Sequence, residues 1–452
     1  MSLTPHTIAS RIDGRTAADI ATSIAQAIRT GEIPAASTLP TIRSLADALH
    51  TSPSTVSDAW RTLRRHGLID TDRRRGTTVR ADRPFGSERW WHVPVAPGTL
   101  ELDLSTGTPD PALLPDLGSA LGRVQIDHQV TSYLDRPLLP ALEAELRHRW
   151  PFDPAAVTVL DGAQDALDRT ITMTIGLGDR VVVETPTFPP LLDMLELAGA
   201  DIVGVPVDAE GLDPEGLAEA LGEPTRAIFV QPRAHNPTGA AFTTARASLL
   251  AELIEPTNAL IVEDDHSGDV AGVPLVSLGR WLPDRTIHIH SFSKSHGPDL
   301  RLAAVGGAAE PISAIVRRRQ LGASWTSRLL QQVLLELLTD PDAQAAVTMA
   351  AERYLARRRA LGAALVQRGL NVEPLGTGLN LWIPVADEQS TVVGLAALGV
   401  GVAPGKPFEV MPSASDHIRV TISTLDDPSE LADALVATGT SGNVGYAPTS
   451  AR

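Results

Sequence analysis

The chain has 452 residues, which is long for one simple domain, and no cysteine, which excludes disulfides, thiol catalysis and cysteine-based metal sites. Residues 1–83 carry 12 Arg and 8 Asp plus Glu, a net charge of +4, whereas the remainder carries 26 of the 38 basic and 46 of the 54 acidic residues, a net charge of −20. A basic head on an acidic body favours nucleic-acid binding confined to the head. No apolar run reaches membrane-spanning length and no signal pattern opens the chain, so we expect a cytoplasmic protein without membrane contact.

The N-terminal 81 residues begin with three predicted helices. In the first, isoleucine recurs at every fourth position between Thr16 and Gly31, and glycine favours a helix end. The second follows Thr41, whose side chain can cap it. The third begins at Ser52, has proline in its first position and is expected to end at Gly67. Apolar residues at helical spacing in all three predict a shared core.

The outer face of the third predicted helix is short, polar and basic. It carries Ser54, Thr55, Asp58 and Arg61. Such a face suits a recognition helix in the major groove of DNA. Residues 68–71 and 77–80 are predicted to pair as a β-hairpin whose tip is Arg73, Arg74 and Arg75. A wing of this kind would contact phosphates or the minor groove.

Four segments of the head match a known pattern. They are Ile28-x-x-Gly31, Leu39-Pro40-Thr41-x-Arg43-x-Leu45-Ala46, Thr55-Val56 and Leu63-x-x-x-Gly67-Leu68-Ile69. With them, residues 16–80 resemble the GntR-type winged helix-turn-helix. The resemblance implies that double-stranded DNA is bound by Arg43, Ser52, Thr55 and the wing arginines, although Pro53 stands where the family often has an arginine. A three-helix protein–protein module is the alternative.

Composition marks the expected domain boundaries. Residues 82–100, rich in proline, glycine and charge, are expected to link a head of residues 1–81 to a body of residues 101–437. Trp90 and Trp91 in this linker are expected to pack on the body, with stacking on a ligand as the alternative. From about residue 335 the body is expected to continue as a smaller α+β subdomain. Residues 438–452 are predicted to be disordered.

The body is predicted to hold a buried, mostly parallel α/β sheet. Apolar runs of strand length alternate with amphipathic stretches such as Leu191–Ala198 and Arg246–Ile254. The predicted strands are Val157–Leu160, Val181–Glu184, Ile202–Pro206, Ala227–Val230, Ala259–Val262, Thr286–His290 and Ala303–Gly306. The smaller subdomain is expected to contain a basic helix, residues 351–367, and strands at residues 380–384 and 417–423. Ligands of such sheets bind at the carboxyl ends of the strands.

Lys294 lies in a polar turn after the strand predicted at Thr286–His290. Among 38 basic residues only Lys294 and Lys406 are lysines. A lysine retained in an arginine-rich chain points to chemistry that a guanidinium cannot perform, because an amine can lose its proton and form a Schiff base with an aldehyde. Nearby Ser291, Ser293 and Arg301 would suit a phosphate. Lys406 has no such neighbouring residues in the sequence. For Lys294, the alternative is a solvated lysine in a serine-rich turn.

Five segments at the predicted strand ends follow one order along the chain. They are Asp161-Gly162-Ala163-Gln164, Thr185-Pro186-Thr187-Phe188-Pro189, Asn236-Pro237-Thr238-Gly239, Glu263-Asp264-Asp265-His266 and Ser291-x-x-Lys294 with Arg301. In this order they resemble the fold-type I pyridoxal-phosphate (PLP) enzymes of the aspartate aminotransferase superfamily. The resemblance implies an α/β PLP-dependent transferase fold, with PLP on Lys294 as the catalytic residue and its phosphate at Gly162, Ala163 and Gln164.

The same resemblance implies further roles around the cofactor. Phe188 would stack on the pyridine ring, Asn236 would bond the phenolic oxygen, and Asp264 would keep the pyridine nitrogen protonated. His266 stands where the superfamily usually has a tyrosine and could bond the phenolic oxygen in its place. Tyr133 resembles the tyrosine that reaches the phosphate of a neighbouring subunit.

Arg419, in the predicted strand at residues 417–423, stands where the superfamily places its substrate-carboxylate arginine. An arginine on the surface of that strand is the alternative.

A winged helix followed by an aminotransferase-like body resembles the MocR subfamily of GntR-type transcriptional regulators. The resemblance implies a homodimer that binds double-stranded DNA and senses a small amino compound through aldimine exchange at Lys294. Two alternatives remain open. PLP itself could be the effector, in which case Arg419 would not be needed, or the chain could be an active PLP-dependent aminotransferase carrying a DNA-binding head.

Overall fold

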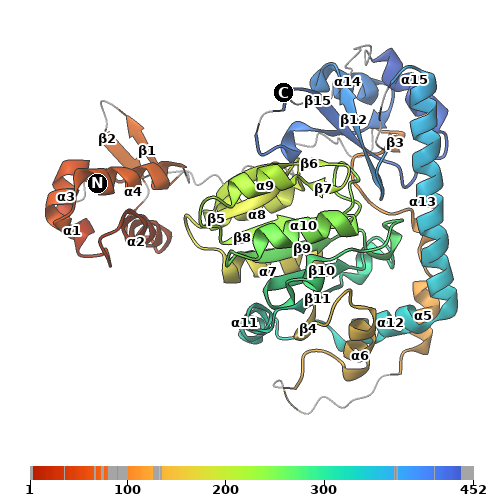
Figure 1. Ribbon diagram of the computed structural model, residues 1–452, viewed down its shortest axis with the longest axis horizontal. Coiled ribbons are helices and arrows are strands. Elements are labelled where there is room, and N and C mark those ends of the chain that lie inside the picture. Colours follow the sequence, from red (N-terminus) through yellow and green to blue (C-terminus); the bar gives the residue numbers. More distant parts are fainter. Residues whose placement is uncertain are drawn as a thin grey trace. The chain divides into compact units, whose positions relative to one another are not determined.

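The computed structural model describes residues 4–34, 36–65, 68–72, 76–79, 89, 100–125, 132, 135–370, 372, 375–411 and 413–438. The chain divides into two compact units, one built on the N-terminal 88 residues and the other on most of the remaining chain (Figure 1). The predicted linker tryptophans Trp90 and Trp91, the wing arginines, Tyr133 and the tail after residue 438 lie outside the described residues. Within the described ranges, every helix is too short or too polar to span a bilayer.

The head contains four helices, α1 (Pro5–Ala9), α2 (Ala17–Arg29), α3 (Ile42–Leu49) and α4 (Pro53–Arg65). The last three confirm the predicted helices, whereas α1 was not predicted. Thr16 caps α2 through a capping box with Asp19, and the Thr41 hydroxyl accepts a hydrogen bond from the Ser44 amide to cap α3. These caps satisfy amide groups that a helix start leaves without intrahelical partners.

The core of the head consists of the apolar positions that the helical spacing predicts. Ile20, Ile24, Leu45, Val56 and Leu63 are all buried. The hairpin is formed by β1 (Ile69–Asp72) and β2 (Gly76–Val79), which pair antiparallel. The segment around residue 38 adds to the outer edge of β2 through a bridge between Thr38 and Thr78. The head is therefore a helical bundle with a small β-wing.

An eight-stranded sheet forms the centre of the body (Figure 1). Its order is β4 (Ala156–Leu160), β11 (Ala303–Gly307), β10 (Thr286–Ser291), β9 (Leu260–Asp265), β8 (Ala227–Val230), β5 (Arg180–Thr185), β6 (Asp201–Asp208) and β7 (Gly211–Leu212). Strands β5, β8, β9 and β10 are parallel, while β11 is antiparallel to both β10 and β4. The predicted α/β sheet is confirmed, and β4 runs in the same direction as β10.

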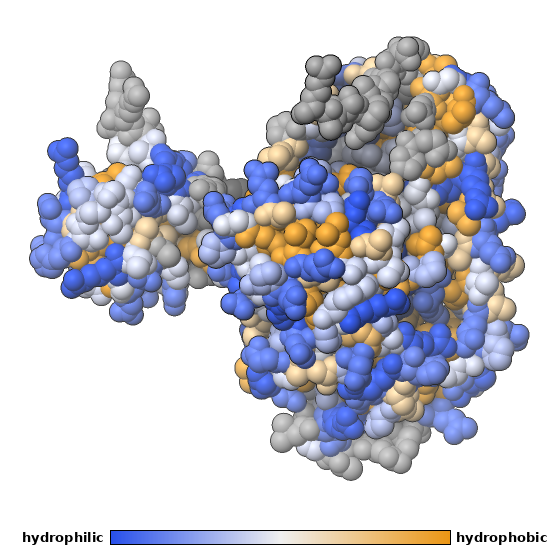
Figure 2. All heavy atoms as spheres, viewed as in Figure 1, coloured by the Kyte–Doolittle hydropathy of each residue, from blue (hydrophilic) through white to orange (hydrophobic). Residues whose placement is uncertain are grey.

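Helices alternate with these strands as the sequence patterns predict. The connections between strands contain α7 (Ala163–Thr174), α8 (Pro189–Ala198), α9 (Pro214–Ala220) and α10 (Thr244–Ile254). Helices α5 (Leu117–Arg123) and α6 (Pro140–Arg149) precede β4, and α11 (Ala309–Gln320) and α12 (Arg328–Thr339) follow β11. One apolar cluster joins α9 and α10 to β5, β8 and β9, and another joins α6 and α12 to β4 and β11. On the side seen in Figure 2, polar and charged residues cover much of the body and apolar residues emerge between them.

The smaller subdomain begins with α13 (Pro341–Gln367), the long helix along one side of the body in Figure 1. It starts ten residues before the predicted helix, because Asp340 caps it and Pro341 suits the first position. The other elements are β12 (Asn380–Val385), α14 (Glu388–Ala397), β13 (Val400–Gly401), β14 (Ala403–Pro404), β15 (Asp416–Thr421) and α15 (Pro428–Ala437). Strands β12, β15 and β14 form one sheet, and β13 pairs with β3 (Leu102–Asp103), so the start of the body joins its C-terminal part.

A single buried arginine ties α13 to the loop before β12. Arg358 is 1% exposed and donates hydrogen bonds to the carbonyl oxygens of Leu375, Gly378 and Asn380. Its neighbour Arg359 is exposed. The two residues therefore offer a matched pair of positions on the same helix.

We predict that Arg358→Met destabilises the protein by about 3 kcal/mol, because three buried carbonyl groups lose a charged donor. The same change at Arg359 should alter stability by less than about 0.5 kcal/mol. Chemical denaturation of the two variants and the unmodified chain measures both effects. Equal midpoints for the two variants would contradict the structural role given to Arg358.

Candidate functional site

The predicted site residues meet at one edge of the large sheet. Strands β4, β5, β8, β9 and β10 point their carboxyl ends toward this edge. The segments that follow them are the five singled out in the sequence. In the register of the sheet, Ser291 lies beside Ala303, and Ala303 lies beside Leu160. Residues separated by more than a hundred positions in the chain are thus neighbours.

A cradle for an anion lies where α7 begins. Gly162 precedes the helix with φ of +101°, a conformation that favours glycine, and no side chain caps the helix start. The Arg301 guanidinium donates to the Asp161 carbonyl at 3.4 Å. A Cβ added to Gly162 would lie 3.2 Å from Arg301 Nη2. The amide groups at the start of α7 and the arginine therefore border one small space, as a phosphate requires.

Ser291 and Ser293 lie on the same side of this site. Ser291 ends β10 and is buried, and its hydroxyl accepts a hydrogen bond from the Ser293 amide at 3.3 Å. Arg301 has a left-handed backbone with φ of +49° at the end of the short helical turn Pro298–Leu300. The structure brings Gly162, Ser291 and Arg301 into one neighbourhood, as the sequence predicted.

Lys294 follows β10 in a partly buried turn. Burial lowers the pKa of its amine to about 8, with a further lowering by the positive charges of Arg419 and Arg301, while Asp264 opposes the change. A lysine with this pKa offers a neutral amine at neutral pH far more readily than a solvated one. Lys294 is therefore not an ordinary surface lysine, and the residues that act on its charge are those predicted to share its site.

Asp264, near the end of β9, is a buried carboxyl group with one unsatisfied oxygen among the described residues. It is 6% exposed, and its Oδ1 atom accepts no hydrogen bond from the described residues. Burial raises the pKa of this carboxyl to about 7, and the charges of Asp265 and Glu184 raise it further, while the charge of Lys294 is the one that lowers it. A buried acceptor without a donor is costly, so this position suits a ligand that brings its own N–H group.

Arg419 and Asn236 meet on the other side of the site. The amide oxygen of Asn236 accepts from Arg419 Nη1 at 3.4 Å and from Asn380 Nδ2 at 3.3 Å. Arg419 is 2% exposed, its Nη2 donates to the Ser105 carbonyl, and its guanidinium lies 5.2 Å from the centre of the Phe408 ring. Burial lowers its pKa to about 10. The alternative of a surface arginine is wrong. The charge of Asp103 opposes the lowering of this pKa, but no carboxylate of the described residues lies within ion-pair distance of the guanidinium.

His266 follows β9, and Phe188 immediately precedes α8. Burial lowers the pKa of His266 to about 3, and the nearby Lys294 charge lowers it further, so the imidazole is neutral. Its Nε2 lies 3.2 Å from the Ser267 hydroxyl, while the buried Nδ1 has no hydrogen-bond partner among the described residues. Phe188 is partly buried at the start of α8, after the cis Thr185–Pro186 bond. Stacking by Phe188 and a bond from His266 remain predictions.

Sequence reasoning missed the residues that hold Arg419 and Asn236 in place. Ser105, which follows β3, and Asn380, at the start of β12, are both buried. The Asn380 side-chain oxygen accepts from the Thr421 hydroxyl at 3.0 Å. The pairing of β12 with β15 brings Asn380 to this site, and a hydrogen bond from the Thr421 amide to the Leu104 carbonyl brings Ser105 there. No local motif marks either residue.

The candidate DNA contacts of the head lie mainly on α4. Ser52 caps this helix by accepting from the Thr55 amide at 3.1 Å, and its hydroxyl also lies within hydrogen-bond distance of the Ser54 and Thr55 hydroxyls. Arg61 is exposed on the same helix and pairs with Asp58 at 2.7 Å. Arg43 is exposed on α3. Arg73, Arg74 and Arg75 lie outside the described residues.

Comparison with known proteins identifies both parts of the chain. Residues 16–79 match the GntR family of bacterial regulatory proteins, and residues 100–435 match aminotransferase class I and II. The vitamin B6 salvage pathway transcriptional repressor PtsJ of Salmonella typhimurium is 37% identical over 434 residues, which cover 92% of this chain and 96% of the repressor.

The chain belongs to the MocR subfamily of GntR-type transcriptional regulators.

Two further comparisons show what each part of this MocR regulator is similar to. The pyridoxine biosynthesis transcriptional regulator PdxR of Corynebacterium glutamicum is 30% identical over 275 residues, covering 58% of this chain and 59% of that regulator. The α-aminoadipate aminotransferase LysN of Thermus thermophilus superposes with a TM-score of 0.69 over 78% of this chain and 97% of the enzyme, at 22% identity. The latter establishes the shared fold alone.

The site of this MocR regulator fits pyridoxal phosphate, the cofactor of its fold. The unpartnered Asp264 oxygen suits a protonated ring nitrogen, and the space beside Gly162 suits a phosphate. When bound, the cofactor supplies an aldehyde for an amine and an electron-accepting ring. The residues of the chain that would hold it are those around Gly162 and Arg301 for its phosphate, Asp264 for its ring nitrogen and Lys294 for its aldehyde.

We predict that PLP becomes covalently fixed to Lys294 on borohydride treatment, because its lowered pKa supplies a neutral amine. Lys294→Ala should remove the added mass from the protein, whereas Lys406→Ala should retain it. Mass spectrometry of the intact variants and of the peptide around residue 294 checks both outcomes. Labelling that survives in Lys294→Ala would show that another group holds the cofactor.

We predict that Asp264→Asn stabilises the cofactor-free protein in a pH-dependent way. The folded pKa is raised from 3.8 to about 7, so charging this carboxyl opposes folding. The stability advantage of the variant should grow from about pH 4 to about pH 7 and then stay constant, with an upper limit of about 4 kcal/mol. Denaturation at several pH values measures it. An advantage that is independent of pH would refute the assigned cause.

Proposed function

We propose that this MocR regulator is a cytoplasmic homodimer whose PLP-loaded body senses a small amino compound and whose head binds double-stranded DNA accordingly. We assign the head to residues 1–81 and the sensing body to residues 101–437, joined by residues 82–100. The GntR match supports DNA binding, and the aminotransferase-like body is consistent with a small-molecule effector.

One observation carries the choice of effector class. Arg419 is a buried guanidinium without a carboxylate partner among the described residues, and its charge acts on Lys294. A ligand with both an amino and a carboxylate group would complement the two residues at once. The carboxylate would pair with Arg419 through a charge-assisted hydrogen bond, which is strong in a buried site. The amine would react with the cofactor held at Lys294. Arg419 and Lys294 therefore support an amino-acid-like effector.

A second candidate function is favoured by the relatives. The names of PtsJ and PdxR tie those proteins to vitamin B6 salvage and pyridoxine biosynthesis. For this chain they support PLP itself as the effector, with binding of the cofactor as the signal. Arg419 would then be dispensable for the response. A working aminotransferase ranks behind both regulators, because the relatives with the same two-domain organisation are named as regulators.

The effector class is tested by DNA binding of Arg419→Met. DNA fragments enriched by the protein from a random pool provide the probe, and fluorescence anisotropy measures the Kd with PLP alone and with a panel of amino acids. If the effector is an amino acid, one or more panel members change the Kd of the unmodified protein, and Arg419→Met loses that change. A response to PLP alone that Arg419→Met retains would instead support the cofactor as the effector.

We predict that Arg61→Ala weakens binding of the enriched DNA by about tenfold, because it removes a charged group from the proposed recognition face of α4. Arg353→Ala, an exposed change on α13 of the body, is the matched control and should leave the Kd unchanged. Anisotropy titrations at one fixed salt concentration compare the two. Equal affinities of both variants would remove α4 from the DNA interface.

A further inference from the structure

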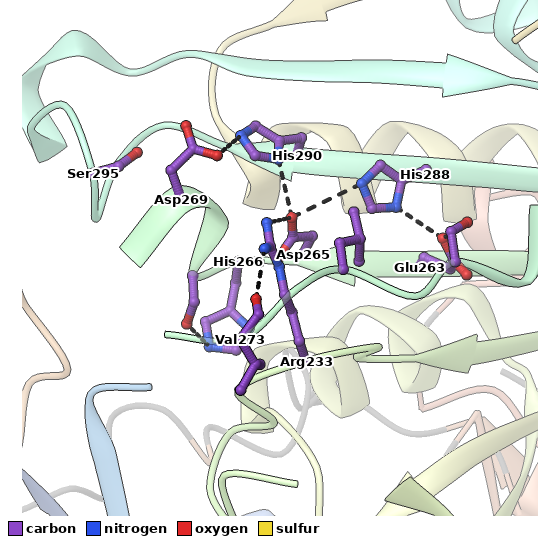
Figure 3. A network of polar contacts seen from close by, with 12 residues as sticks. Arg233, Glu263, Asp265, His266, Asp269, Val273, His288, His290 and Ser295 are labelled. Atoms are coloured by element: carbon purple, nitrogen blue, oxygen red, sulfur yellow. Dashed lines mark hydrogen bonds and ion pairs between the residues drawn. The ribbon is translucent and has the colours of Figure 1, made fainter. Parts of the chain in front are cut away.

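A second polar cluster lies on the face of the sheet opposite Asp264. Successive strand residues point to opposite faces, so Glu263 and Asp265 of β9 face away from Asp264. In the parallel register with β10, His288 lies beside Glu263 and His290 beside Asp265. Figure 3 shows these four side chains together with Arg233. The cluster is separate from the residues assigned to the cofactor.

The buried charges of this cluster are arranged around Asp265. Arg233 forms a two-pronged ion pair with it, with Nε to Oδ1 at 2.9 Å and Nη2 to Oδ2 at 2.7 Å. His290 Nδ1 lies 3.0 Å from the same Oδ2 atom (Figure 3). His288 Nδ1 is bonded to Glu263 at 2.8 Å, whereas its buried Nε2 lies 3.9 Å from Asp265 and has no hydrogen-bond partner among the described residues.

A cavity of about 380 Å³ opens beside this cluster. This volume lies within the range of about 300–1,000 Å³ that is typical of small-molecule sites. Its polar wall includes His288, His290 and Asp269. Its apolar wall consists of Leu146 in α6, Trp150 directly after α6, Phe292 directly after β10 and Leu338 in α12. An apolar body with a few placed polar groups is the usual composition of a ligand site.

The charge of the cavity lining favours an anion. Arg149, Arg233 and Arg280 line it, against the carboxylate of Asp269. Arg233 is neutralised by Asp265, and Arg149 pairs with Glu145 at 2.5 Å. Arg280 donates to the Leu275 carbonyl at 3.3 Å and forms no ion pair with a described residue. An exposed guanidinium without an acid, next to aromatic and leucine side chains, suits a carboxylate attached to an apolar group.

A metal ion is the other occupant to consider, because ligand atoms of Asp265, His288 and His290 lie within 4.8 Å of one another. However, both oxygens of Asp265 already accept from the Arg233 guanidinium. A cation there would have to displace a buried positive charge or lie beside it, which electrostatic repulsion disfavours.

We propose that this cavity is a second ligand site, which binds a small carboxylate with an aromatic or aliphatic body. The carboxylate pairs with Arg280 at the rim, and the apolar body packs between Trp150 and Phe292. The proposal is independent of the effector assigned to the cofactor site, since none of its residues belongs to that site.

Benzoate is the first probe, with neutral benzamide as its isostere, and isothermal titration with the full-length PLP-loaded protein measures binding. We expect one benzoate per chain and at least tenfold weaker binding of benzamide, because the charged partner of Arg280 is missing. Arg280→Leu should weaken benzoate binding by about tenfold or more. Arg359 is an exposed arginine outside the cavity, so Arg359→Leu should leave benzoate binding unchanged. Arg280 is exposed, so this variant is expected to fold.

Leu275→Trp provides a second variant, which should block benzoate by filling the cavity from its wall. Three results would overturn the proposal. Benzoate could fail to bind. It could bind equally well to Arg280→Leu but be lost in Arg419→Leu, which would place it in the cofactor site. Finally, the protein could bind zinc but not benzoate, and His288→Ala could lose the zinc binding. That result would make the cluster a metal site.

Discussion

The body of this protein depends on charges that are buried without full compensation from the chain. The Asp264 carboxylate, the Lys294 amine and the Arg419 guanidinium share one site, and each has a pKa displaced by burial. Burying an incompletely paired charge costs free energy that the rest of the fold must offset. A cofactor with a ring nitrogen and a phosphate, together with the carboxylate of the effector that we propose, would supply the missing counterparts. Ligand binding and the stability of the body are therefore linked through the same residues.

The arrangement of these charges also explains how a small ligand can affect more than its own site. Lys294 follows β10 of the large sheet, whereas Arg419 lies on β15 of the smaller subdomain. Asn236 and Asn380 connect the two parts through a hydrogen bond across the site. A ligand that pairs with Arg419 and reacts at Lys294 would bridge both parts of the body. Such a bridge favours one relative arrangement over another, which is the physical basis of a two-state signal.

Much of this site could be predicted from sequence because its motifs are local. Each motif can be recognised within a few residues: a glycine that opens a helix, a lysine after an apolar strand, or paired acids at a strand end. The strands that present them were predictable because buried parallel strands are continuously apolar. In the head, the capping residue Thr41 marked the start of α3 in the same way.

The parts that sequence could not predict depend on pairing between distant segments. Helix α1 has five residues, too few for a periodic pattern. Ser105 and Asn380 act on the site only because β3 and β12 join the smaller subdomain. The cluster behind the sheet forms because His288 aligns with Glu263, and His290 with Asp265, in the register of β9 and β10. No single strand contains that information.

We propose that the state of Lys294 controls DNA binding by the head. The most direct test is to titrate PLP into the cofactor-free protein and measure the Kd for an enriched DNA fragment, with the unmodified chain and with Lys294→Ala. We predict that PLP, alone or with an effector amino acid, changes the Kd of the unmodified chain and leaves that of Lys294→Ala unchanged. The same change in both proteins would contradict the claim, because the signal would then bypass the lysine.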